Sequence, residues 1–146
     1  MSMADTETWD VIVVGGGNAA LCAALSAQED GARVLLLERA PQEARGGNSA
    51  FTGGSMRFAF NSAEVIHGIV PDLSKEEIAN TDFGTYPESL FFDDIYKVTQ
   101  FRTDPELAEV LIKNSQAAVR WMTKQGIRYV PLYRSEEHTS ELQSRL

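Results

Sequence analysis

Cysteine and histidine are scarce in this chain of 146 residues. It has one cysteine, Cys22, and two histidines, His67 and His138. A single cysteine cannot close an internal disulfide, and Cys22 lies among alanines in a helical pattern, so we expect it to fill space in a buried helix. We expect no metal site.

Basic residues are also few. The chain has 13 lysines and arginines against 21 aspartates and glutamates, which gives a formal net charge of -8. Proteins that bind nucleic acids concentrate lysine and arginine on one face, because they must neutralise phosphates. No such cluster occurs here, and we expect no nucleic-acid partner.

Long apolar runs are absent as well. None approaches the ~20 residues that a membrane-spanning helix needs, so we expect no transmembrane segment. The first ten residues, MSMADTETWD, are acidic and lack the basic and apolar regions of a secretory signal. A cytoplasmic location is therefore the expectation.

The last residues differ from the rest of the chain. From Arg134 the sequence reads RSEEHTSELQS, which resembles a translation of the adapter oligonucleotide used in short-read sequencing. The segment is polar and has no periodicity. We expect residues 134–146 to be an artefact, and the alternative is a short disordered polar tail. On the first interpretation His138 has no role, and His67 is the only histidine.

The first forty residues carry a strand, a helix and a second strand. Residues 10–14 and 33–38 are continuous apolar runs, and residues 18–30 have helical spacing with Gly31 at the end. Continuous apolar runs are typical of parallel strands that are covered on both faces. The sequence therefore predicts a β-α-β unit.

Three consecutive glycines follow the first predicted strand. Gly15, Gly17 and Ala20 match the pattern G-x-G-x-x-G/A, and Glu38 ends the second strand. The first glycine permits a tight turn, the second lets a pyrophosphate approach the main chain, and the small third residue allows close packing of helix and strand. We expect a side chain at position 15 or 17 to stand where the diphosphate must lie.

The start of the predicted helix and the end of the second strand complete this nucleotide pattern. The free amides and positive dipole of the helix start, at Asn18 and Ala19, would hold the phosphates. Glu38 can accept hydrogen bonds from both ribose hydroxyls of an adenosine, which argues against NADP, although Arg39 beside it weakens that exclusion. The alternative interpretation is a glycine turn between two packed elements.

A second glycine-rich segment, ARGGNSAFTGGSMRF at residues 44–58, bears on the type of dinucleotide. A plain nicotinamide enzyme of the Rossmann type continues into its next helix after the ribose-binding acid and does not need such a segment. A flavin needs more donors along its length, and this segment is rich in amides and hydroxyls. We therefore predict FAD, and the alternative is a simple surface loop.

These patterns predict an α/β fold, a Rossmann-like FAD/NAD(P)-binding domain with a parallel sheet. We expect the domain to be incomplete (truncated), because two or three parallel strands cannot cover both faces of their sheet. We expect three parts: residues 1–60 as the β-α-β segment that binds FAD, residues 61–133 as its helical extension, and residues 134–146 as the artefactual tail.

The extension is expected to end in a long helix and a strand. The helix runs from Pro105 to Gln125 with Asp104 or Thr103 as its N-cap, and residues 127–130 form the strand. A shorter helix begins at the capping box of Ser74 and Glu77. The expected core face of the long helix consists of Leu107, Leu111, Ala118 and Met122.

Together the motifs resemble the flavoprotein family of fumarate reductase and succinate dehydrogenase. The matching stretches are DVIVVGGGNAAL, VLLLERA and GGNSAFTGGSMRF, and the likeness covers residues 9–133. It implies that Gly15–Ala19 and Glu38, with Arg39 next to it, hold the ADP half of FAD. The residues implied at the pyrophosphate and flavin are Gly47, Asn48, Ser49, Gly53 and Gly54. Membrane-bound family members carry a covalent flavin on a histidine where this chain has Asn48, so the resemblance implies noncovalent FAD.

Within this family, GGGNAAL, ERAP, RGGNS and MRFA together are most similar to the tricarballylate dehydrogenases. The resemblance implies a flavin-dependent oxidoreductase that passes a hydride from a small-molecule carboxylate, such as tricarballylate, to flavin N5. It also allows an electron-acceptor protein as a partner. The alternatives are a flavoenzyme like fumarate reductase or ketosteroid dehydrogenase or, for the chain as given, an inactive nucleotide-binding fragment.

We assign no catalytic residue. The resemblance implies that the arginines and histidines that handle substrate lie in segments outside this sequence. Arg57 and His67 are the nearest candidates, and we interpret them as a solvated arginine and a loop histidine.

Overall fold

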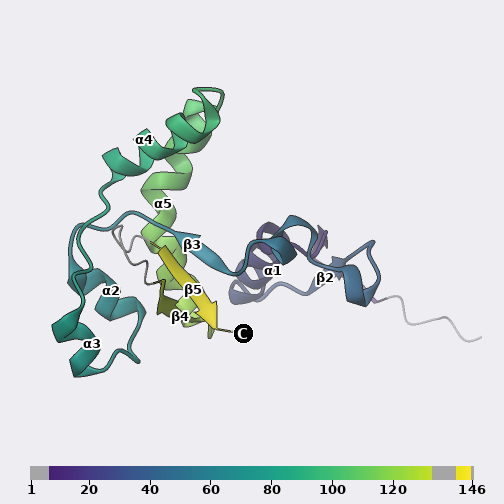
Figure 1. Cartoon of the computed structure of the whole chain (residues 1–146). Coiled ribbons are helices and arrows are strands. Elements are labelled where there is room, and N and C mark those ends of the chain that lie inside the picture. Colours follow the sequence, from purple (N-terminus) through teal and green to yellow (C-terminus); the bar gives the residue numbers. More distant parts are fainter. Residues whose placement is uncertain (1–6, 133–140, 146) are drawn as a thin grey trace, which may run out of the picture. The chain divides into compact units, whose positions relative to one another are not determined.

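The computed structural model describes residues 7–132 and 141–145 (Figure 1). The chain divides into two compact units, Met1–Gly53 and Gly54–Leu146, here called unit 1 and unit 2. This division falls after Gly53, a few residues before residue 60, where we expected the FAD-binding segment to end. Both units combine helices with strands, and the parallel sheet lies in unit 1.

Unit 1 contains the predicted β-α-β unit. Its elements are β1 (Val11–Val14), α1 (Asn18–Glu29) and β2 (Val34–Leu37), followed by the short 3-10 turns η1 (Gln42–Ala44) and η2 (Gly47–Phe51). Strands β1 and β2 are parallel and pair residue for residue, and α1 contacts both. Gly31 ends the helix with a φ of +83°, a conformation that glycine adopts without strain.

The strands of unit 1 are less buried than their composition predicts. Ile12 and Val14 are 59% and 81% exposed, whereas Val13, which points to the opposite face, is 9% exposed. Helix α1 contains no buried residue, and Cys22 is half-buried. The expectation of a buried helix is therefore wrong. Helix α1 packs against a sheet of only two described strands, which is too narrow to bury its side chains.

Unit 2 combines four helices with an antiparallel sheet of strand order β3-β5-β4 among its described residues. Its elements are β3 (Ser55–Arg57), α2 (Ala63–Ile69), α3 (Lys75–Asn80), α4 (Glu88–Thr99), α5 (Pro105–Lys124), β4 (Arg128–Pro131) and β5 (Glu141–Arg145). Figure 1 shows α4 packed beside the first turns of α5, and an aromatic and aliphatic core joins the helices to the chain after β3. The least exposed members of that core are Phe58, Phe60, Ile66, Ile69 and Ile112.

Strand β5 belongs to the segment that we expect to be an artefact. It pairs with both β3 and β4, while residues 133–140 and 146 lie outside the described residues. Pairing of this kind requires an extended backbone and no particular side chains. The expectation that residues 134–146 do not belong to the natural protein therefore stays a prediction.

The predicted helix starts of unit 2 are confirmed. The Oδ1 atom of Asp104, rather than Thr103, caps α5 by accepting hydrogen bonds from the amides of Glu106 and Leu107 at 2.9 and 3.2 Å. At α3, the amide of Glu77 donates to the Ser74 hydroxyl and the amide of Ser74 donates to the Glu77 carboxylate.

The core face predicted for α5 is wrong by one position. Leu107 and Leu111 are 69% and 56% exposed, and the buried residues are Ala108, Ile112, Ser115 and Val119. Both sets have helical spacing, so periodicity alone could not separate them. Ser115 is tolerated in the core because its hydroxyl accepts the Ala59 amide and donates to the Ile112 carbonyl, at 3.0 and 2.7 Å.

Candidate cofactor-binding site

The turn between β1 and α1 requires glycine at its first position for conformational reasons. Gly15 has a φ of +116°, where residues with a side chain are strained, and its amide donates to the Leu37 carbonyl of β2 at 2.7 Å. A Cβ at this position would lie 3.8 Å from the Cβ of Ala20, an ordinary contact. The backbone angle, rather than lack of space, thus excludes other residues.

Gly17 lies against the second glycine-rich segment. A Cβ on Gly17 would lie 3.4 Å from both the Gly46 carbonyl oxygen and the Ser49 hydroxyl. Both distances are ordinary contacts, and the expectation that a side chain at 17 would stand where the diphosphate lies stays a prediction. The two glycine-rich segments, far apart in the sequence, therefore form one junction at the start of α1.

The start of α1 has no cap from its own chain neighbour. Gly17 occupies the N-cap position and cannot supply a side chain, and the Asn18 amide donates instead to the Ser49 hydroxyl at 3.0 Å. The other first-turn amides, including that of Ala19, have no partner within the helix. No acidic side chain lies in the first turn. This end of α1 is therefore suited to an anion.

The Glu38 carboxylate lies beside the same turn. Its Oε1 accepts the Ala40 amide at 2.8 Å, and its Oε2 lies 2.7 Å from where a Cβ on Gly16 would be. The pKa of Glu38 is lowered, chiefly by the amide of Ala40. Burial opposes this effect, and the amides of Arg39 and Gly16 add smaller lowering effects. The carboxylate is therefore held in its charged form.

The sequence patterns did not predict the contact between Gly16 and Glu38. Gly16 stands at a variable position of the fingerprint, yet its missing side chain leaves room for the Glu38 carboxylate. The run of three glycines, one more than the pattern requires, was the available signal.

The remaining predicted residues are distributed along the chain after β2. Arg39 and Asn48 are exposed, and Gly47 begins η2 with a φ of +54°. Gly53 and Gly54 both have left-handed backbone angles, and they lie at the end of unit 1 and the start of unit 2. The structure thus brings together Gly17, Asn18 and Ser49, with Glu38 at the same turn.

The two outlying candidates differ from their interpretation. Arg57 is exposed, as expected, but its guanidinium forms an ion pair with Asp94 at 2.8 Å. His67 lies in α2 rather than in a loop, with its ring edge-on to Phe83 at 5.5 Å. Its Nε2 atom is buried and has no hydrogen-bond partner among the described residues.

Within residues 7–132 and 141–145, no group of histidine, cysteine, aspartate and glutamate side chains is arranged to hold a metal ion. In the same part of the chain, no helix has the length and apolar character that crossing a membrane requires.

Comparison with known proteins identifies the family. A model of the FAD binding domain matches residues 10–145. The fumarate reductase (cytochrome) of Shewanella frigidimarina is 35% identical over 126 residues, which are 86% of this chain and 19% of that protein. The NADH:fumarate oxidoreductase of Klebsiella pneumoniae is 31% identical over 121 residues, 83% of this chain and 11% of that protein.

A solved structure shows the same fold. The open conformation of a flavocytochrome c3 fumarate reductase matches 96% of this chain and 22% of its own, with a TM-score of 0.62 and 28% identity. The chain spans about a fifth or less of the length of these relatives. From the family match and these likenesses, the chain belongs to the FAD binding domain family, within the flavoprotein superfamily of fumarate reductase and succinate dehydrogenase, and its cofactor is FAD.

Proposed function

We propose that this chain forms the part of a flavin-dependent oxidoreductase that holds the ADP half of FAD and the start of its flavin half. The junction of Gly17, Asn18 and Ser49 carries the proposal, because it joins two glycine-rich segments at a helix start that is suited to an anion. The pyrophosphate would bind there, on the amide of Ala19 and on that of Asn18, which it would share with the Ser49 hydroxyl.

Glu38 would bind the adenosine ribose. Backbone amides hold its carboxylate in a charged form next to the β1–α1 turn, and a carboxylate can accept bonds from both ribose hydroxyls. Arg39 is exposed beside it. A 2′-phosphate would meet the negative charge of Glu38, so the site favours FAD over NADP.

The flavin side would be served by Gly47, Asn48, Ser49, Gly53 and Gly54, whose amides and side chains supply donors. Asn48 has no nucleophilic group that could form a covalent link to the flavin, so the cofactor would be held noncovalently. In the parent enzyme FAD supplies hydride chemistry at N5, and the protein supplies orientation and charge.

We propose that the parent enzyme acts on a small polycarboxylate. Tricarballylate is one candidate substrate, supported by the resemblance of GGGNAAL, ERAP, RGGNS and MRFA. Fumarate is the second candidate, favoured by the names of the relatives from Shewanella and Klebsiella. An electron-transfer protein would be the partner of either enzyme. The chain by itself is expected to bind nucleotide without turnover. Reduction of an oxidised dye with tricarballylate, or oxidation of a reduced dye with fumarate, would contradict that expectation.

The test is a binding competition with the full chain. FAD binding, followed by quenching of flavin fluorescence, should be stronger than binding of NAD or NADP. Glu38→Ala should weaken FAD binding, because the ribose hydroxyls lose a charged acceptor. Glu43→Ala, which removes an exposed acid from η1, is the matched control and should change nothing. If the unmodified chain bound FAD and NADP with equal affinity, Glu38 could not be the residue that binds the ribose and repels a 2′-phosphate.

A further inference from the structure

Helix α5 carries a second apolar face beside the one that lies in the core. The buried face consists of Ala108, Ile112, Ser115 and Val119. A separate row, at the spacing of one side of a helix, is here called the α5 stripe and consists of Leu107, Val110, Leu111, Asn114 and Ala118. All five residues of the stripe are exposed. Helix α5 therefore presents more apolar surface than is buried within unit 2.

The large side chains of the stripe adjoin one another. Leu107, Val110 and Leu111 are 69%, 62% and 56% exposed. Leu107 lies three positions before Val110 and four before Leu111, so the three side chains are neighbours on the helix surface. Single exposed apolar residues are normal on proteins, whereas adjoining large ones are typical of interaction surfaces.

The charges of α5 change sign along the helix. The acidic residues Glu106 and Glu109 lie within its first five positions, and all of its basic residues follow them, at Lys113, Arg120 and Lys124. Two copies of α5 packed antiparallel would bring the acidic start of each helix to the basic end of the other. Parallel packing would bring like charges together. The helix is therefore complementary in charge to an antiparallel copy of itself.

One pair of charges borders the stripe at its two ends. Glu106 lies four positions before Val110 and Lys124 lies fourteen after it, which places both along the same edge of the stripe. Glu109 pairs with Lys113 in the same helix. The charge contacts between two antiparallel copies would therefore rest on Glu106 of one and Lys124 of the other.

Asn114 lies near the middle of α5 and within the stripe. A two-fold axis beside Asn114 would place Leu111 of one copy opposite Ala118 of the other, a large residue against a small one. The Asn114 side-chain amide donates to the Val110 carbonyl at 2.7 Å, and its oxygen is an acceptor that the second copy could use. A single polar residue in an apolar helix seam fixes the alignment of the helices.

We propose that the α5 stripe is a self-association surface, at which two copies of this chain pair their α5 helices antiparallel about a two-fold axis near Asn114. Apolar contact between the stripes supplies the attraction, and the change of charge along the helix sets the direction. An interface of one helix from each copy is small, so the dimer is weak and depends on concentration. This inference goes beyond the proposed function, because none of its residues belongs to the candidate cofactor site.

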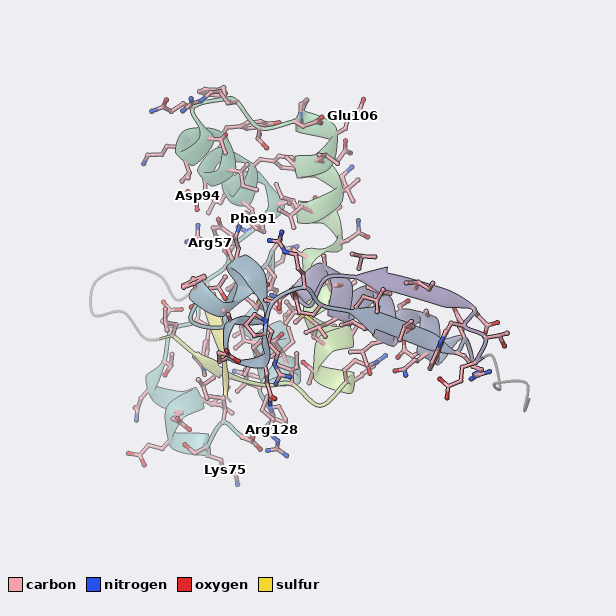
Figure 2. The ribbon with its side chains drawn as sticks, turned by 90° about the vertical axis from the view of Figure 1, so that its right-hand side faces the viewer. Arg57, Lys75, Phe91, Asp94, Glu106 and Arg128 are labelled. Atoms are coloured by element: carbon pink, nitrogen blue, oxygen red, sulfur yellow. The ribbon has the colours of Figure 1, made fainter. Side chains whose placement is uncertain are left out.

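The experiment is sedimentation equilibrium of the full chain over a range of concentrations, in which the molecular mass should rise from that of one copy toward that of two. Leu111→Ala should weaken association about tenfold, because each substitution near a two-fold axis removes contact from both copies. Ile78→Ala is the matched control, since Ile78 is 39% exposed on α3. Figure 2 shows Lys75 of α3 and Glu106 of α5 at opposite ends of unit 2. The control should leave association unchanged.

Two further sets of variants test the direction of pairing. Glu106→Lys and Lys124→Glu should each weaken association a few-fold, and the double variant that carries both should recover it, because the contacts are rebuilt with reversed charge. Asn114→Cys, in a Cys22→Ser background, should form a disulfide between copies on mild oxidation, since equivalent residues beside a two-fold axis lie close together. Glu109→Cys in the same background should not, because its spacing from Asn114 places it on the other side of the helix.

Three results would overturn the inference. The first is a chain that stays monomeric at every concentration, which would leave the stripe to another segment of a longer polypeptide. The second is a dimer that Leu111→Ala does not weaken, which would place the contact on another surface. The third is a dimer in which the double charge reversal restores nothing and Asn114→Cys forms no link, which would exclude the antiparallel arrangement. Circular dichroism of each variant should match the unmodified chain, because the substituted side chains are exposed.

Discussion

Replacing Ser49 by alanine tests the junction between the two glycine-rich segments. The Ser49 hydroxyl accepts the Asn18 amide at 3.0 Å, and Gly17 has no side chain that could take its place. Removing a side chain that caps a helix start costs about 1 kcal/mol. The unfolding free energy of Ser49→Ala should fall by that amount, and Ser49→Thr, which keeps the hydroxyl, should recover most of it.

FAD binding should fall in the same variant. If the hydroxyl helps to form the pyrophosphate site, the loss of about 1 kcal/mol corresponds to about fivefold weaker binding. The assays are urea denaturation followed by circular dichroism, and titration with FAD. Ser26→Ala is the matched control, because Ser26 is exposed on the same helix and alanine is a good helix former. The reasoning is refuted if Ser49→Ala matches Ser26→Ala in both stability and affinity.

Three further predictions concern single positions. Ile112→Ala should lower the unfolding free energy by about 2–5 kcal/mol and Leu111→Ala by less than about 0.5, because Ile112 is 1% and Leu111 56% exposed; equal losses in denaturation would place the core on the other face. Gly15→Ala should cost about 1–3 kcal/mol in the same assay through its φ of +116°, and a neutral effect would contradict the strained turn. The pKa of folded Glu38 lies below the ordinary value of 4.5, so the charged carboxylate should stabilise the fold fully above about pH 4.5. This stabilisation should disappear as the pH falls through the lowered pKa. It would be disproved if the difference in unfolding free energy between the unmodified chain and Glu38→Gln stayed constant as the pH falls.

The sequence by itself determined the local features of this protein. The β-α-β order, the glycine turn after β1, the cap at Asp104 and the reciprocal cap of Ser74 and Glu77 follow from residues within a few positions of one another. Backbone angles and caps of this kind depend on the identity of adjacent residues, so a pattern can predict them.

Only the tertiary structure decided which groups meet across long stretches of chain. In the folded chain, Ile112 rather than Leu111 is buried in the core. The Ser49 hydroxyl contacts the start of α1, and Arg57 forms an ion pair with Asp94. Each choice depends on what another segment presents. Helical spacing fits either face of α5, and nothing close to residue 49 or 57 in the sequence identifies its partner. Such contacts form only when distant segments pack together. The contacts of the candidate site could therefore be identified only from the tertiary structure.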